Sequence, residues 1–205
     1  MPATPTARTG RTTRSEPLRR ALRLEYATVA WNALEVFVTI GLGIAAGSLA
    51  LIGFGLDSLV EIFASAVALW HLQGAREPER TRRALWLVAL AFFALAAVLF
   101  AGVARDLVTD HRAGESPLGI AYLGVTAVVM LSLAIGKRRT SAELDDHPLS
   151  HEARVTFLDS ALATGILLAL AANAALGWWW ADTLAAALVG LVAVSEGIAA
   201  PREHD

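Results

Sequence analysis

Six long apolar stretches follow one another along the chain, and short polar segments separate them. A helix needs roughly 20 mostly apolar residues to cross the hydrocarbon of a bilayer, and each stretch is about that long. The sequence therefore predicts an all-α, polytopic membrane protein with six transmembrane helices. We expect these helices near residues 26–46, 49–71, 84–104, 118–136, 155–177 and 181–199.

The composition supports a membrane protein and narrows its chemistry. Hydrophobic residues make up 56% of the 205 positions and charged residues 18%, against about 25% charged in soluble domains. The chain has no cysteine, so any metal must be bound by oxygen or imidazole. It has no glycine-rich phosphate loop, hydrolase elbow or metal-binding histidine pair on one helix. We therefore expect a secondary transporter, not an enzyme, without a tightly bound cofactor or a nucleic-acid partner.

Basic residues mark alternate connections between the stretches. The other connections hold Arg105 and Arg112 beside acidic residues. Because cytoplasmic segments of membrane proteins are rich in Lys and Arg, we expect both termini in the cytoplasm and a multi-pass protein of the plasma membrane. The residues concerned are Arg8, Arg11, Arg14, Arg19, Arg20, Arg23, Arg76, Arg80, Arg82, Arg83, Lys137, Arg138, Arg139 and Arg154.

The predicted helices leave little chain outside the bilayer. We expect residues 1–24 to form a disordered basic cytoplasmic tail, 25–200 the six-helix transmembrane domain and 201–205 a short tail, with no C-terminal cytoplasmic domain. A transit peptide is the alternative for residues 1–24, which are rich in Arg, Thr and Ser but lack amphipathic periodicity.

Small and aromatic residues gather near the predicted outer face. Gly43 and Gly47 have the spacing that lets membrane helices approach closely. Glycine also relaxes a short turn, and the sequence alone favours neither role. The run Trp178, Trp179, Trp180 fits an aromatic belt at the membrane interface.

Besides Asp182 and Glu196, which lie near the ends of the sixth stretch, four acidic residues fall within the apolar stretches: Glu35, Asp57, Glu61 and Asp159. Asp57 and Glu61 are four residues apart, a spacing that puts both carboxylates on one helix face with Cβ atoms about 5–6 Å apart. They can therefore approach one cation. Glu35 lies midway along the first stretch, and Asp159 lies close enough to the start of the fifth to sit at the interface.

These acids need a counter-ion or protons. Each costs about 2.5–3.5 kcal/mol at a bilayer centre, and no Lys or Arg falls inside a predicted span. A bound cation or exchangeable protons would offset this cost. Because two ionised carboxylates repel one another, the pair favours exchange of protons against a cation. The alternative is that neutral acids tie helices together by hydrogen bonds.

A second acidic group, with two histidines, lies between the fourth and fifth stretches. It fits a metal-collecting surface, but a solvated acidic loop is the favoured interpretation. Its members are Glu143, Asp145, Asp146, His147, His151 and Glu152.

The segment GSLALIGFGLDSLVEIFASAVALW resembles the second span of the cation diffusion facilitator family. NALEVFVTIGLGIAAGSLAL is similar to that family's first span, and FLDSALATGILLAL and WWWADTLAAALVGLVAV to its fifth and sixth. The resemblance implies six-helix protomers, usually homodimeric, that export divalent cations such as zinc from the cytoplasm in exchange for protons. It implies metal ligation by Asp57, Glu61 and Asp159.

The chain departs from the family pattern at two points. The family's first span-five ligand falls at Val155, which cannot coordinate a metal, and Glu35 is a hypothetical replacement that the resemblance itself does not supply. We expect the usual C-terminal domain to be absent, so the chain is similar to the short, transmembrane-163 form.

We therefore expect an exporter of zinc or, since carboxylates suit harder ions, manganese or iron. The alternative is a non-transporting assembly partner or metal sensor with the same fold. A proton-coupled carrier of an organic cation is a third interpretation, for which an aromatic-lined cavity would be expected.

Overall fold

A computed structural model describes residues 15–73, 78–144 and 147–200; within these ranges the side chains of residues 15, 64–73, 78–81, 84, 147, 148 and 151 are not described. The described chain is entirely helical apart from short connections. Its helices are α1 (Ser15–Ala46), α2 (Leu49–Gln73), α3 (Pro78–Thr109), α4 (Pro117–Leu144), α5 (His147–Leu176) and α6 (Trp180–Ala199).

Most of these helices are long and apolar enough to cross a membrane. Five of them qualify by length and composition, over Glu16–Ala46, Leu85–Thr109, Pro117–Leu144, Glu152–Leu176 and Trp180–Ala199. Large apolar side chains such as Phe37 and Val108 are 78% and 86% exposed, as suits a surface solvated by lipid tails. The all-α fold expected from the sequence is therefore confirmed, and the five apolar helices, one fewer than the six spans expected, suggest a multi-pass membrane protein.

The first helix begins inside the segment that the sequence predicted to be a disordered tail. The predicted disordered tail extended to residue 24, but α1 is helical from Ser15, and residues 1–14 and 201–205 lie outside the described part. The early start has a packing reason. A Cβ on Gly136 of α4 would meet the side chain of Leu24 at 3.1 Å, and Arg20 lies 3.3 Å from Glu143, so α1 continues along the extended α4.

The predicted connection between the fourth and fifth spans is mostly helical, which corrects the placement of Lys137. This residue lies inside α4 with a fully buried side chain, and its Nζ is 3.1 Å from Glu25 and 3.7 Å from Glu152. Carboxylates on α1 and α5 balance the charge of the buried ammonium. One basic residue therefore lies inside the bundle, although none falls inside a predicted span. The side chains of His147 and His151 lie outside the described part.

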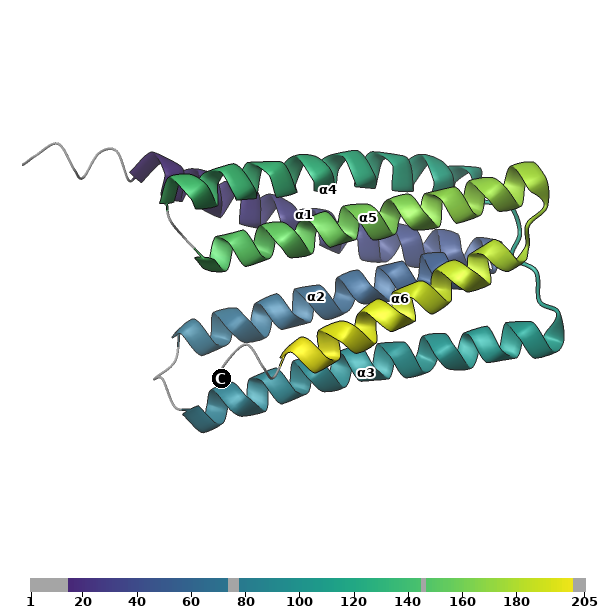
Figure 1. The fold of residues 1–205 in the computed structure, drawn as a ribbon, viewed down its shortest axis with the longest axis horizontal. Coiled ribbons are helices and arrows are strands. Elements are labelled where there is room, and N and C mark those ends of the chain that lie inside the picture. Colours follow the sequence, from purple (N-terminus) through teal and green to yellow (C-terminus); the bar gives the residue numbers. More distant parts are fainter. Residues whose placement is uncertain (1–14, 74–77, 145–146, 201–205) are drawn as a thin grey trace, which may run out of the picture.

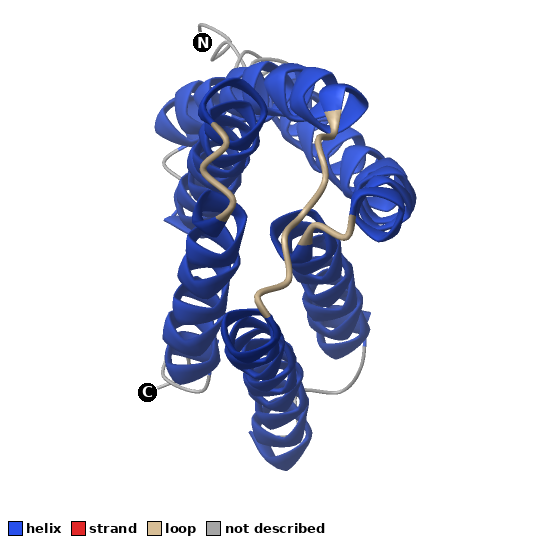
Figure 2. Ribbon diagram, turned by 90° about the vertical axis from the view of Figure 1, so that its right-hand side faces the viewer, coloured by secondary structure: helices blue, strands red, loops and turns tan. Residues whose placement is uncertain are grey.

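The helices run up and down, so α1, α3 and α5 begin at one end of the molecule (Figure 1). We call this the basic end, because Arg19, Arg20, Arg23, Arg82, Arg83, Arg138, Arg139 and Arg154 belong to it. Figure 2 looks from the opposite, far end, where tan connections join the helices. The closest pairs are α4 with α5, α1 with α2 and α3 with α6. Since α2 also packs against α3, α6 and α5, it is the central helix.

Glycines serve both suggested roles at the junction of α1 and α2. Gly47 has a φ of +64°, which L side chains disfavour, and Ser48 N donates to Gly43 O at 2.9 Å to end α1. A Cβ on Gly43 would lie 2.7 Å from Ile52 Cγ1, and one on Gly55 2.7 Å from Ile40 Cγ1. Glycine therefore makes the turn and also admits the close α1–α2 contact.

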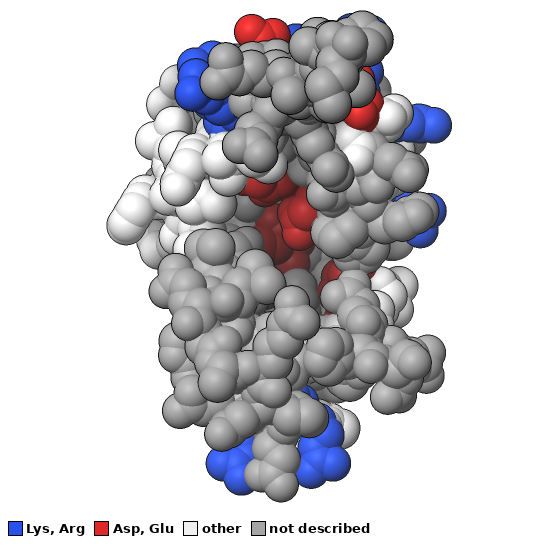
Figure 3. Space-filling model, turned by 90° about the vertical axis from the view of Figure 1, so that its left-hand side faces the viewer, with Lys and Arg blue, Asp and Glu red and all other residues white. Residues whose placement is uncertain are grey.

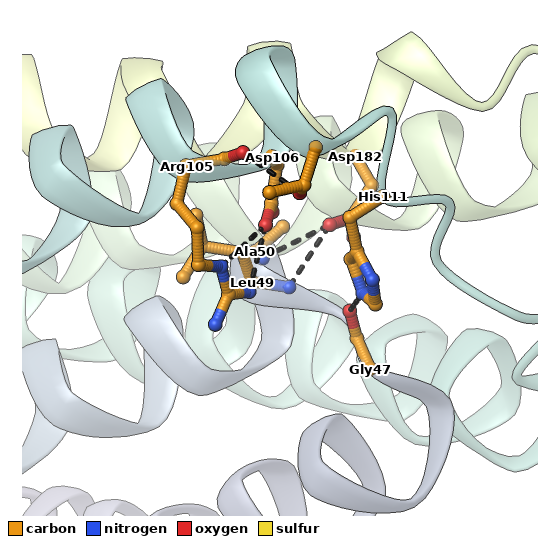
Figure 4. A network of polar contacts seen from close by, with 8 residues as sticks. Gly47, Leu49, Ala50, Arg105, Asp106, His111 and Asp182 are labelled. Carbon is orange, nitrogen blue, oxygen red and sulfur yellow. Dashed lines mark hydrogen bonds and ion pairs between the residues drawn. The ribbon is translucent and has the colours of Figure 1, made fainter.

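The start of α2 is fixed by a carboxylate from α6. Oδ2 of Asp182 accepts from Leu49 N at 2.9 Å and Ala50 N at 3.4 Å, while Oδ1 accepts from Ser48 Oγ at 2.5 Å. The free N–H groups and positive dipole end of a helix favour such an anion. Figure 4 shows this network together with His111, whose Nε2 lies 3.2 Å from Gly47 O. The position of α2 along the bundle is thereby set.

Candidate metal centre

Three carboxylates from two helices converge inside the bundle. Asp57 and Glu61 come from α2 and Asp159 from α5, and one oxygen of each lies within 4.8 Å of the others. Asp57 is 5% exposed and Asp159 6%. Oxygens bound to one dication at about 2.0–2.5 Å lie up to about 4–5 Å apart, so the group has the dimensions of a metal site.

Helix geometry accounts for the convergence. Asp57 and Glu61, one turn apart, occupy one face of α2. The sequence placed Asp159 close to the start of the fifth stretch, where it could lie at the membrane interface. In the structure α5 begins at His147, so Asp159 lies well inside the helix. Because α5 begins early, Asp159 lies within the helix and beside the two acids of α2.

Further polar groups hold this cluster from α1. Asn32 donates from Nδ2 to Glu61 Oε2 at 2.9 Å. The adjacent Glu35, 1% exposed, accepts from the Ser58 hydroxyl at 2.6 Å. Ser58 follows Asp57 directly, so α1 hydrogen-bonds to α2 at Glu61 and at the residue next to Asp57.

Glu35 lies beside the group of three but does not belong to it. Among the described residues, the only group of three or more with metal-ligand spacing is Asp57, Glu61 and Asp159. Glu35 is near enough to act on each of these acids electrostatically, but its contact to α2 runs through Ser58. Val155 stands where the family has a metal ligand, and Glu35 does not replace that ligand in this arrangement.

Acidic side chains are visible from outside at the basic end (Figure 3). Figure 3 looks onto the basic end and shows a hollow with acidic side chains at its bottom and basic side chains on the surrounding surface. The arrangement can attract and hold a cation from the basic end.

Lys137 adds one buried positive charge close to the candidate metal centre. It is close enough to attract Asp159 electrostatically, while its direct partners are Glu25 and Glu152. Sequence inspection missed this residue because its place next to Arg138 and Arg139 suggested a solvated connection. The only available signal was its position directly after the predicted fourth span.

Ser58 and Thr126 were also missed as neighbours of the buried acids. A hydroxyl residue in an apolar helix usually bonds its own backbone, as Thr39 does to Glu35 O at 2.7 Å. The sequence cannot distinguish this common case from a contact between helices.

No protein-family model matches this chain, and no curated protein matches it. Its function is therefore argued from the site.

Proposed function

We propose that the protein is a secondary transporter that moves divalent metal cations out of the cytoplasm in exchange for protons. The observation that carries the proposal is the group Asp57, Glu61 and Asp159, in which both aspartates are buried and one oxygen of each residue lies within 4.8 Å of the others. Three carboxylates in hydrocarbon are costly unless a cation or protons neutralise them. A site that must hold one or the other is suited to exchanging them.

In this mechanism the three carboxylates bind the ion, and Asn32 orients Glu61 by its 2.9 Å hydrogen bond. Protonated carboxyls have lost the charge that attracts a dication, so protons and metal compete. Release on the far side requires rearrangement of α2 against α5, which both contribute ligands. Their direct contact is slight compared with that of α2 with α1, which favours such movement.

The ion is proposed to be zinc, with manganese and iron as alternatives. Zinc follows from the resemblance of the second apolar stretch to cation diffusion facilitators. The oxygen-only ligand group also suits harder ions, so transport assays with each ion distinguish zinc, manganese and iron.

We propose that α2 also crosses the membrane, which makes six spans with the five other helices. The protein is proposed to lie in the plasma membrane with its basic end in the cytoplasm. The start of α1 and the end of α6 share that end (Figure 1). Because the chain has no cysteine, single cysteines can be labelled without background. Ala142→Cys should react with a membrane-impermeant maleimide only after permeabilisation, and Glu115→Cys in intact cells. The reverse pattern would refute the orientation.

Transport is tested with purified protein in vesicles carrying a pH gradient. Wild-type protein should move zinc or manganese, and Asp57→Asn should abolish the flux. Asp106→Asn is the matched control, since Asp106 is also a buried aspartate, 2% exposed, but is paired with Arg105 in α3. Absence of flux for zinc, manganese and iron would favour a non-transporting assembly partner or sensor.

A further inference from the structure

A buried ammonium group joins three helices near the candidate metal centre. Lys137 of α4 is fully buried, and its Nζ lies 3.1 Å from Glu25 Oε2 of α1 and 3.7 Å from Glu152 Oε2 of α5. A buried ion pair adds little stability compared with apolar side chains of the same volume. Stability therefore does not explain why a lysine stands here, and the transport mechanism proposed for the three acids does not use it.

Both acidic partners of Lys137 stand seven residues before residues of the metal centre and its surroundings. Glu152 precedes Asp159 on α5, and Glu25 precedes Asn32 on α1. Seven residues bring an α-helix to within about 20° of the same face and advance it by about 10 Å. Because α1 and α5 begin at the basic end (Figure 1), Lys137 and its two partners lie about 10 Å nearer to that end than the metal ligands. We call these three residues the lysine layer.

The lysine layer acts on the metal centre through space. Lys137 is close enough to attract Asp159 electrostatically, and Glu152 is close enough to repel Glu61. Because the Lys137 side chain is fully buried, water screens its charge less than it screens the exposed arginines of the basic end. A dication bound at the centre is therefore repelled by a positive charge that its ligands do not neutralise.

We propose that Lys137 limits how tightly the metal centre holds a divalent cation, so that the ion can leave again. The inference rests on the proposed function and adds to it a residue that sets affinity without touching the ion. Three carboxylates attract a dication strongly, and a tightly held ion dissociates slowly. The ammonium offsets part of that attraction from a fixed place, since carboxylates of α1 and α5 hold it there.

The first experiment measures zinc affinity by calorimetric titration of purified protein at one pH. Lys137→Met removes the charge and keeps a side chain of similar length. At about 10 Å a unit charge changes the affinity for a dication about fourfold even in the dielectric of water, and more in a protein interior. Lys137→Met should therefore lower the Kd for zinc on the order of tenfold, and Lys137→Arg should stay close to wild type. An unchanged or higher Kd in Lys137→Met would overturn the inference.

Arg138→Met is the matched control for a change in net charge. Arg138 follows Lys137 on α4, but its side chain is exposed, so water and salt screen its charge. Its replacement should leave the Kd for zinc within about twofold of wild type. Equal shifts in Lys137→Met and Arg138→Met would show an effect of total charge and contradict a special role of Lys137.

Glu152→Gln makes the opposite change of charge in the same layer. It removes a negative charge and leaves Lys137 paired with Glu25, so the Kd for zinc should rise. Because Glu152 is 52% exposed, the change should be smaller than that in Lys137→Met. Damage to the fold would weaken binding in both variants, so a Kd that rises in both would overturn the inference. Lys137→Gln tests the same point if the methionine variant does not fold.

Flux measurements separate this inference from the transport proposal. In vesicles, Lys137→Met should lower both the KM for zinc and the maximal rate, because tighter binding slows release. A wild-type protein that binds zinc without moving it refutes transport, and the calorimetric comparison then still decides the role of Lys137. Normal transport together with an unchanged Kd in Lys137→Met refutes the role of Lys137 alone. A wild-type protein that binds no divalent cation refutes both.

Discussion

The side-chain amide of Asn32 on α1 donates a 2.9 Å hydrogen bond to Oε2 of Glu61 on α2. Glu61 also lies with one carboxylate oxygen within 4.8 Å of oxygens of Asp57 and Asp159. The hydrogen bond links the candidate metal centre to α1, the helix that carries Glu35. Polar partners of this kind orient metal ligands and hold them in place.

Replacing Asn32 should therefore weaken metal binding without removing a ligand. Asn32→Leu is expected to raise the Kd for zinc by about 10–100-fold, the usual effect of losing a partner that orients a ligand. Calorimetric titration measures it. Asn173→Leu is the control, because Asn173 bonds Ala113 O at 3.0 Å away from the acids. Equal affinity in both variants would mean that Asn32 does not orient Glu61.

Metal should stabilise the folded protein. A ligand that binds the folded state alone adds about 2.7 kcal/mol at a concentration of 100 Kd, so zinc or manganese should raise the melting temperature in proportion to the logarithm of its concentration. Thermal scanning in detergent measures the shift. Asp57→Asn should abolish it and Asp106→Asn preserve it. A shift that persists in Asp57→Asn would locate the metal elsewhere.

The close approach of α1 and α2 predicts opposite effects at two glycines. A Cβ on Gly55 would lie 2.7 Å from Ile40 Cγ1, whereas one on Gly41 meets nothing within 4 Å. Gly55→Ala should cost about 1–3 kcal/mol of unfolding free energy through overpacking. Gly41→Ala should add about 0.5–1 kcal/mol through reduced chain entropy. Unfolding by denaturing detergent compares them, and a neutral Gly55→Ala would argue against close packing.

The buried Lys137 predicts an asymmetric response to removing charges. Lys137→Met should cost no more than about 1 kcal/mol, because the side chains of Glu25 and Glu152 are 36% and 52% exposed and remain hydrated. Glu25→Gln combined with Glu152→Gln leaves the ammonium buried without a counter-charge and should cost about 3–5 kcal/mol. The same unfolding assay measures both. Equal losses would show that the ammonium is hydrated despite its burial.

Much of the fold could be predicted because hydrophobicity acts locally. A run of about 20 apolar residues must be helical in a membrane, whatever its neighbours, so the helices were predicted with the ends near Ala46 and Leu49 correct. The basic ends of α1, α3, α4 and α5 extend beyond the predicted spans. There, contacts between helices, such as Leu24 against Gly136, continue a helix through residues that are polar in sequence.

For the candidate site, the sequence by itself determined which acids are stranded among apolar residues, and that Asp57 and Glu61 share a face, since helical spacing depends on nothing beyond the chain. Only the tertiary structure decided that Asp159 meets them, that Glu35 pairs with Ser58, and that Lys137 is buried. These relationships join residues tens of positions apart. They depend on how α1, α2, α4 and α5 rotate and slide against one another, which side-chain packing fixes and a single stretch of sequence does not record.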